Sequence, residues 1–361
     1  MTPDVTDQVR VPRQVCAGVH ARLLTRDGVE LDVACAPGAT VLESAAEAGF
    51  TLPSLCGTGT CGACHAVVRE GEFTMGEHDP DALPQKGGRP VPGSVLLCRT
   101  HPVSDLRVDL PYERVHVIDG RVPTRRASVA SIEPVADSTV RLRLHLEADS
   151  VLGAGLDFQP GQFVELEIPG TDVRRAYSLA NTANWDGVAE LLIRMRPGGA
   201  FSTWLAQTAS VGDQLLVHGP QGAFGLRENG LGPRWFVGGG TGIAPLLAMV
   251  RRMAEWGDPQ PVRVFLGVGQ QSELLVVDDL REAGAGLSAF RLDVSVWQPG
   301  PDCTEVVGTP VDQLVPALAE GGPVPDVYIC GPPAMVDGAA EALRGAGLSE
   351  EHLILERYLA C

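Results

Sequence analysis

The segment from Cys56 to Cys64 constrains this chain more than any other. It reads Cys-Gly-Thr-Gly-Thr-Cys-Gly-Ala-Cys, so three thiols share one short loop with four and then two residues between them. Cys98 follows on a separate apolar segment. Three ligands from one loop and a fourth from a distant segment form the spacing of a [2Fe–2S] cluster. The spacing therefore predicts that Cys56, Cys61, Cys64 and Cys98 are metal ligands.

Glycines separate the thiols of this loop. Gly57, Gly59 and Gly62 permit positive φ and let backbone N–H groups approach an anionic cluster. A zinc site is the alternative, although zinc modules usually group their ligands as two close pairs rather than as three plus one. A disulfide framework is disfavoured because the chain has nine cysteines, an odd number, and no secretory signal.

Length and composition limit the number of domains and the class of protein that the chain can form. A chain of 361 residues exceeds one ordinary core, so we expect two to three domains. The content of 44% hydrophobic and 20% charged residues is typical of a folded protein. We expect a cytoplasmic protein, because the start is unlike a signal peptide and no apolar run approaches the roughly 18 residues of a membrane helix. The net charge of −17 argues against binding to nucleic acid or anionic membranes.

The first part of the chain shows two patterns. Residues 1–16 are predicted to form a flexible tail. Residues 17–112 combine two alternating strands at 20–24 and 29–35, a helix that begins with a capping box at Thr40, the cysteine loop and further strands at 65–69 and 106–110, which predicts a compact α+β domain. Residues 113–125 are expected to be a linker.

Two further domains are predicted after the linker. Over residues 126–228, short β segments suggest a small antiparallel barrel. They are expected at 127–132, 139–146, 162–168, 174–179, 190–195 and 214–218, with one helix at 200–207. Over residues 229–361, apolar strands alternate with helices, which predicts a doubly wound parallel sheet. The strands are expected at 235–238, 262–267, 292–296, 327–330 and 353–355, and the helices at 244–256, 278–283, 311–318 and 334–345.

Two loops of the predicted parallel sheet are candidates for nucleotide binding. The first, Gly239-Gly240-Thr241-Gly242, joins a strand to a helix, where a pyrophosphate can reach bare N–H groups, although it does not match the G-x-G-x-x-G spacing. The second, Cys330-Gly331-Pro332, closes a later strand, so both loops could border one crevice with the thiol facing a nicotinamide. A buried cysteine before a proline-marked helix start is an equally good reading of the second loop.

The predicted barrel carries a candidate flavin site. Arg175, Tyr177 and Ser178 lie on one strand and offer a cation for a pyrophosphate, a ring for the isoalloxazine and a hydroxyl for N5. Gly199 and Ser202 open the short helix and offer a second phosphate site. An arginine-rich strand and a serine-capped helix would explain these residues without a ligand.

The order of these motifs resembles the ferredoxin-NADP⁺-reductase-like oxidoreductases. More narrowly, it resembles the reductase components of soluble methane monooxygenase and related bacterial di-iron monooxygenases, which carry an N-terminal plant-type ferredoxin domain of β-grasp-like fold. The matching segments are 95–100, 160–163, 168–170, 199–202 and 355–360. Gly57 departs from the family, in which an arginine often follows the first ligand, and Tyr358 replaces a frequent phenylalanine.

The resemblance implies an electron path from NADH through FAD and a [2Fe–2S] cluster to a di-iron hydroxylase that docks transiently on the ferredoxin domain. The residues themselves favour NADH over NADPH, because the 267–273 stretch lacks a basic residue and Glu273 would repel a 2′-phosphate. The resemblance also implies a role for each candidate residue. Arg175, Gly199 and Ser202 would bind the phosphates of FAD, and Tyr177, Ser178 and Tyr358 would contact its ring. NADH would be bound by Gly239, Gly240, Thr241, Gly242, Gly331 and Pro332, and Ser178, Cys330 and Glu356 would form the catalytic group.

Two other functions remain open at this point. A reductase of a Rieske dioxygenase or of an aromatic (phenol or toluene) hydroxylase would share every motif above. A protein of another class, a zinc-binding regulatory or scaffold protein with an inert α/β domain, would share only the four cysteines.

Overall fold

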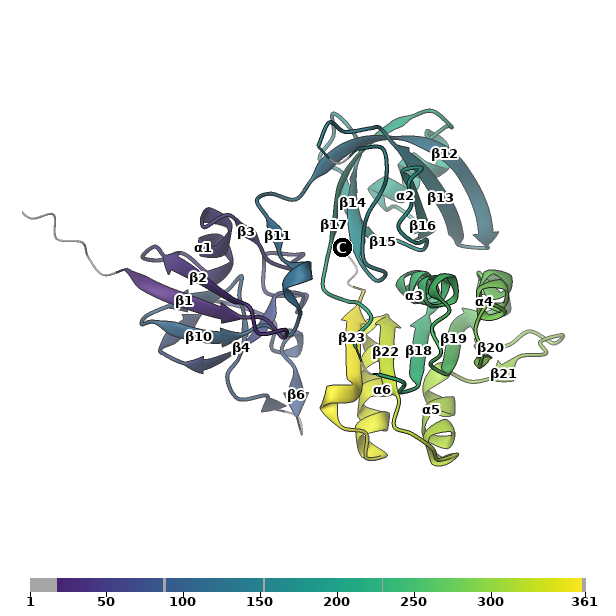
Figure 1. Ribbon diagram of the computed structural model, residues 1–361. Helices are drawn as coiled ribbons and strands as arrows, with labels where there is room; N and C mark the ends of the chain where they lie inside the picture. The colour runs from purple at the N-terminus through teal and green to yellow at the C-terminus, as the bar shows by residue number, and fades with distance from the viewer. Residues whose placement is uncertain (1–17, 87–88, 152, 229, 359–361) are drawn as a thin grey trace, which may run out of the picture. The chain divides into compact units, whose positions relative to one another are not determined.

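The structure of the protein is a computed structural model that describes residues 18–86, 89–151, 153–228 and 230–358 (Figure 1). The predicted tail over residues 1–16 lies outside the described residues. Contacts divide the chain into two compact units, Met1–Arg121 and Val122–Cys361. Among the described residues, no helix is both long and apolar enough to cross a lipid bilayer.

The first unit is an α+β domain, as predicted. Its elements are β1 (Val19–Leu24), β2 (Glu30–Cys35), α1 (Val41–Glu47), β3 (Phe50–Thr51), β4 (His65–Glu70), β5 (Phe73–Met75), η1 (Pro80–Ala82), β6 (Gln85–Lys86), β7 (Arg89–Pro90), β8 (Ser94–Leu96), β9 (Thr100–Pro102), β10 (Leu106–Asp109), η2 (Arg114–His116) and β11 (Ile118–Asp119). The main sheet has the order β2-β1-β10-β4-β8. β1 runs antiparallel to β2 and parallel to β10. Burial alternates along β2, which is why the predicted hairpin packs one face on the core.

Helix α1 begins at the predicted capping box. Thr40 Oγ1 accepts a hydrogen bond from Glu43 N at 3.1 Å, and Glu43 Oε2 accepts one from Thr40 N at 2.8 Å. These reciprocal bonds satisfy two N–H groups that a helix start otherwise leaves unpaired. The helix ends at Glu47, and β3 then leads into the cysteine loop.

Residues 113–125, predicted as a linker, contain secondary structure. η2 and β11 occupy part of this stretch, and β11 pairs antiparallel with β3 of the first unit. Gly120 N donates to Gly49 O at 2.7 Å, and Arg114 forms an ion pair with Asp119. The segment predicted as a linker therefore holds a short helix and a strand that pairs with the first unit. The sequence does not reveal this strand, because two residues show no periodicity.

The second unit begins with an antiparallel barrel. Its elements are β12 (Thr124–Ala136), β13 (Thr139–Leu146), β14 (Phe163–Glu167), β15 (Arg174–Ser178), β16 (Val188–Arg194), α2 (Ala200–Gln207) and β17 (Gln214–Gln221). The strand order is β15-β14-β17-β12-β13-β16. A bridge between Leu179 and Leu191 joins the two outer strands, β15 and β16, so the sheet closes on itself. Apolar side chains fill the interior, among them the buried Leu144, Leu166 and Phe201.

A parallel sheet with helices on both faces follows the barrel (Figure 1). Its elements are β18 (Arg234–Gly239), η3 (Gly240–Gly242), α3 (Ile243–Trp256), β19 (Val262–Gln270), η4 (Gln271–Glu273), α4 (Val277–Gly284), β20 (Phe290–Gln298), β21 (Val306–Val307), α5 (Pro310–Ala319), β22 (Asp326–Gly331), α6 (Pro333–Gly345), η5 (Glu350–His352) and β23 (Leu353–Arg357). The order β21-β20-β19-β18-β22-β23 reverses direction at β18, which is the switch point where such sheets bind ligands. The carboxyl ends of β18 and β22 lie side by side there, with Gly238 opposite Cys330.

A buried arginine fixes the long loop of the barrel. Arg125 lies on β12 and is 6% exposed. Its guanidinium donates hydrogen bonds to the backbone carbonyls of Glu147, Gly153, Ala154 and Gly155 at 2.6–3.2 Å. These carbonyls belong to the connection between β13 and β14, so one side chain satisfies the backbone of a whole loop.

We predict that Arg125→Met lowers the free energy of unfolding of the second unit by about 3 kcal/mol, because several buried carbonyls lose a charged donor at once. Urea unfolding measures this change. Arg126→Met is the matched control, because the neighbouring Arg126 is exposed, and its effect should stay within about 0.5 kcal/mol. Equal losses in the two variants would contradict the role of Arg125.

Candidate functional site

The four predicted ligand cysteines come together in the first unit. Cys56, Cys61 and Cys64 lie on the loop between β3 and β4, and Cys98 follows β8. Leu97 N donates to Cys64 O at 3.0 Å, which brings the distant segment against the loop. The sulfur atoms of Cys64 and Cys98 are 3.3 Å apart as a result.

The thiols form two pairs. Besides Cys64 and Cys98, Cys56 and Cys61 are hydrogen-bonded through their side chains. Burial raises the pKa of Cys56, but hydrogen bonds from Thr58, Thr60 and Cys61 outweigh it and lower that pKa to about 5. No cluster of three or more His, Cys, Asp or Glu side chains in the described ranges has the geometry to hold a single metal ion. Two pairs of thiols suit a binuclear centre, because each iron of a [2Fe–2S] cluster takes two of the four protein ligands.

The glycines of this loop have the conformations that the sequence predicts. Gly59 has a φ of 82° and Gly62 a φ of 76°. A Cβ at Gly62 would lie 2.8 Å from Ala82 O, so a side chain would also collide with η1. The loop donates N–H groups to its own sulfurs, Thr58 N to Cys56 and Ala63 N to Cys61, both at 3.4 Å. Such bonds stabilise thiolates as cluster ligands. The donor set therefore fits a [2Fe–2S] cluster.

The candidate flavin residues lie on β15 and at the start of α2. The Tyr177 ring packs 5.3 Å from the ring of Phe201 on α2, which joins the two segments. Ser202 Oγ accepts a hydrogen bond from Arg196 N at 3.0 Å, so its O–H group keeps a proton to donate to a ligand. Arg175 Nη1 donates to a carbonyl of its own strand, Arg174 O, at 2.7 Å, rather than to a carboxylate.

The glycine-rich turn packs directly on the second predicted loop. A Cβ at Gly242 would lie 2.3 Å from Cys330 O, and one at Gly239 would lie 2.8 Å from Met335 Sδ. Gly240 has a φ of 54°, in the left-handed region. The turn leads into the 14-residue helix α3, whose N-terminus attracts a pyrophosphate. The two predicted loops therefore lie against each other.

The predicted catalytic side chains form a connected group in the second unit. Tyr358 Oη donates to Ser178 Oγ at 2.9 Å across 180 residues of sequence. Cys330 Sγ is 3.6 Å from Glu356 Oε2, and Tyr358 N donates to Gly331 O at 2.8 Å. Glu356 keeps some solvent exposure, yet the protein around it removes enough hydration to raise its pKa to about 8. Burial also raises the pKa of Cys330. These groups are therefore protonated at neutral pH.

Arg194 is a residue near the turn that the sequence did not reveal. It ends β16, and its Nη2 lies 2.7 Å from Glu273 Oε1. Its Nη1 lies 3.8 Å from the position of a Cβ on Gly240, beside the nucleotide turn. Glu273 follows β19 as expected, but its charge is balanced by Arg194, so the argument that it repels a 2′-phosphate was incomplete. Residues 79 apart in sequence carry no local signal of this contact.

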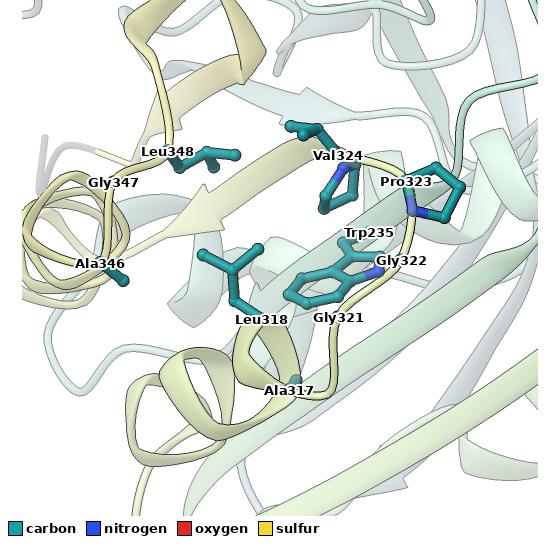
Figure 2. Close-up of a pocket in the computed structure, with 11 residues that line it drawn as sticks. Trp235, Ala317, Leu318, Gly321, Gly322, Pro323, Val324, Ala346, Gly347 and Leu348 are labelled. Carbon is teal, nitrogen blue, oxygen red and sulfur yellow. The ribbon is translucent and has the colours of Figure 1, made fainter.

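A separate cavity lies at the other end of the parallel sheet. It has a volume of about 240 Å³ and is lined by Trp235, Leu318, Val324 and Leu348 among others (Figure 2). Trp235 is near the start of β18, whereas the glycine-rich turn follows the end of that strand. The cavity is therefore distinct from the nucleotide crevice.

Family models match the chain in three consecutive regions. Residues 24–103 match the 2Fe-2S iron-sulfur cluster binding domain, residues 126–225 the oxidoreductase FAD-binding domain and residues 236–341 the oxidoreductase NAD-binding domain. The first region contains the four cysteines, the second the Arg175–Ser178 strand and the third the glycine-rich turn. The cofactors of the chain are therefore a [2Fe–2S] cluster, FAD and NADH. These matches favour an oxidoreductase over a zinc-binding scaffold.

The chain is also similar to whole proteins. It is 34% identical to the reductase component of propane 2-monooxygenase from Rhodococcus jostii over 91% of this chain and 89% of that protein. It is 37% identical to methane monooxygenase component C from Methylosinus trichosporium over 75% and 79% of the two chains. The crystal structure of an Amycolatopsis cytochrome P450 reductase, 32% identical, aligns with a TM-score of 0.70 over 93% of this chain and 98% of that one.

We predict that Gly242→Ala weakens NADH binding at least tenfold, because the added methyl group collides with Cys330 O and opens the crevice. A titration of the protein with NADH under anaerobic conditions measures the binding. Gly338→Ala is the control, because a Cβ at that glycine on α6 meets nothing within 4 Å. Wild-type affinity in Gly242→Ala would show that the two loops do not need their close contact.

The raised pKa of Glu356 predicts a pH dependence of stability. An unfolded glutamate ionises near pH 4.3, whereas the folded carboxyl stays protonated up to about pH 8. The folded state therefore binds the extra proton in this window, and the free energy of unfolding should fall as the pH rises from about 4.5 to about 8. Glu356→Gln should flatten this dependence and remove the infrared band of a protonated carboxyl at pH 7. An unchanged pH profile in the variant would show that Glu356 is already ionised.

Proposed function

Because the chain belongs to the family of oxygenase reductases that carry [2Fe–2S], FAD and NAD-binding domains, we propose that it delivers electrons from NADH to the di-iron hydroxylase of a multicomponent monooxygenase. The observation that supports this proposal most directly is the meeting of Ser178, Tyr358, Cys330 and Glu356 where the glycine-rich turn lies. A barrel residue is joined there to residues of the nucleotide-binding sheet, as a hydride transfer between two bound cofactors requires.

The cofactors divide the chemistry between them. NADH supplies two electrons as a hydride, FAD takes up the pair, and a [2Fe–2S] cluster accepts electrons singly. We propose that residues 17–112 hold the cluster, residues 126–228 hold FAD and residues 229–361 hold NADH. The short stretch between the first two would serve as the connection.

The residues of the second unit would bind and orient the two nucleotides. Gly240, Thr241 and Gly242 offer N–H groups and a helix N-terminus to the pyrophosphate of NADH. Arg175 and Ser202 offer a guanidinium and a hydroxyl to the phosphates of FAD. Arg194 stands beside the nucleotide turn and adds a positive charge there.

The group around Ser178 would hold protons near the reacting rings. Tyr358 donates to Ser178 Oγ, so the Ser178 hydroxyl proton can be donated to the flavin. The raised pKa values of Glu356 and Cys330 keep both side chains mostly protonated at neutral pH, so these two groups add little negative charge beside the glycine-rich turn. Tyr358 would also cover the ring with its aromatic face.

The thiol pairs of the first unit suggest how the irons would be held. We propose that Cys56 and Cys61 bind one iron and that Cys64 and Cys98 bind the other, because these are the pairs that already contact each other. Free cysteines at all four positions suit a reducing compartment, which supports a cytoplasmic location.

Two classes of oxygenase are candidates for the electron acceptor. A di-iron hydroxylase is supported by the propane and methane monooxygenase relatives, and we propose that it docks transiently on the ferredoxin domain. A Rieske dioxygenase is the second candidate, because the chain is 32% identical to the toluate 1,2-dioxygenase electron transfer component from Pseudomonas putida over 92% of its length. Anaerobic mixing of the NADH-reduced protein with purified oxygenases of the two classes would distinguish them.

We predict that Cys98→Ala abolishes electron transfer to an oxygenase but leaves the reduction of FAD by NADH within about twofold of wild type. The substitution removes one ligand of a four-ligand cluster in the first unit and changes nothing in the second. Iron content and the electron paramagnetic resonance signal of the reduced cluster measure the loss, and stopped-flow bleaching measures the flavin step. Cys35→Ala is the control, because Cys35 is a buried thiol on β2 outside the loop. An intact cluster signal in Cys98→Ala would refute this ligand assignment.

A further inference from the structure

Arg251 connects helix α3 to the barrel. Its Nη1 donates to Ala180 O at 2.9 Å and to Glu190 Oε1 at 2.8 Å. Its Nη2 donates to Asp279 Oδ1 on α4 at 2.8 Å. One guanidinium therefore binds the segment after β15, a carboxylate on β16 and a neighbouring helix of the parallel sheet. The side chain is part-buried, which shields these bonds from competing water.

The barrel side of this contact is itself tightly constrained. Ala180 N donates to Glu190 O at 2.8 Å, and Glu190 N donates to Asn181 Oδ1 at 2.9 Å. Glu190 is 5% exposed, and Arg143 of the barrel contacts its other carboxylate oxygen at 2.9 Å. The segment after β15 is therefore bonded to β16, and both accept hydrogen bonds from Arg251.

A second arginine, which lies on the barrel, contacts a helix of the parallel sheet. Arg141 lies on β13 of the barrel, and its Nη2 is 2.7 Å from Asp279 Oδ2. Asp279 thus contacts one arginine from each side of the junction, through different oxygens. Each side of the contact carries both an arginine and a carboxylate. These ion pairs therefore hold helices α3 and α4 against the barrel in one register.

The position of Arg251 along α3 relates this contact to the cofactor crevice. Arg251 lies nine residues beyond Gly242, or about 13 Å along a helix with a rise of 1.5 Å per residue. At the start of the helix, Tyr358 Oη lies 3.5 Å from Thr241 O and 2.9 Å from Ser178 Oγ. Tyr358 therefore lies between Ser178 and the turn that precedes the helix, and Arg251 bonds the helix itself to Ala180.

We propose that Arg251 is a positioning residue that sets the distance between the nicotinamide-binding turn and the flavin-binding strand. This inference rests on the proposed function. Arg251 touches neither cofactor site directly. It acts by holding the helix that begins at the turn against the end of the strand that carries Ser178. Hydride transfer needs its reacting atoms within a few tenths of an ångström of a productive distance, so a small shift of this helix slows it strongly.

The test compares Arg251→Met with wild type in the full chain loaded with its cofactors. We expect the rate of flavin reduction at saturating NADH to fall about 10- to 100-fold, with the FAD content and the dissociation constant of NADH unchanged within about twofold. The long-wavelength charge-transfer absorption between NADH and flavin should weaken, and hydrogen exchange of the Ala180 amide should speed up. If Arg251 only stabilised the fold, the charge-transfer band would not change. The rate of flavin reduction would then not fall relative to the affinity for NADH.

Two further variants make the result decisive. Arg251→Lys keeps the charge but cannot reach three acceptors at once. Its rate of flavin reduction should therefore lie between those of wild type and Arg251→Met. This variant provides the test if Arg251→Met does not fold. Arg252→Met is the matched control, because Arg252 is the next residue of α3 and its guanidinium lies over the Trp256 ring of the same helix. This variant should reduce flavin at the wild-type rate. Wild-type rates in both Arg251 variants, or a change in NADH affinity alone, would overturn this inference. Failure of the wild-type protein itself to be reduced by NADH would instead overturn the proposed function.

Discussion

The close approach of two backbones is the constraint on which the second unit depends. The turn after β18 rests on the end of β22 with no side chain between them, because Gly242 leaves only 2.3 Å for a Cβ beside Cys330 O. This contact is possible at the switch point of the sheet, where neighbouring strands send their loops in opposite directions. Cys330, Glu356 and Tyr358 then lie together at one edge, and Tyr358 reaches the barrel through Ser178.

The cysteine loop of the first unit follows the same logic on a smaller scale. Its glycines allow the chain to fold back on itself, and the bond from Leu97 to Cys64 brings a distant strand end against the loop. The thiols then pair as a binuclear cluster requires, before any iron is considered. In both units, glycines allow the turns from which the reactive side chains project, and backbone contacts bring a second segment against each turn.

Much of the fold could be predicted from periodicity and turn residues. β13 (Thr139–Leu146) and α2 (Ala200–Gln207) have the bounds that the pattern predicts, because their apolar residues recur at the spacing of their elements. β11 could not be predicted, because a strand of two residues has no period. The motifs of the site could be read from the sequence, but the contacts between distant residues could not. Arg194 and Glu273 are 79 residues apart, and Arg251 and Glu190 are 61 apart, so no local sequence pattern indicates these ion pairs.

Only a short segment of chain separates the ferredoxin domain from the barrel along the sequence. Because the first unit binds the chain as far as Gly120 and Pro123 O already accepts a hydrogen bond from the barrel, only residues 121 and 122 lie between the two attachments. A tether of this length spans roughly 3.5 Å per residue at full extension. Delivery of electrons within the molecule is then a first-order event at a high effective concentration, independent of how dilute the protein is. The binding of NADH and the handover to the oxygenase should instead depend on collisions.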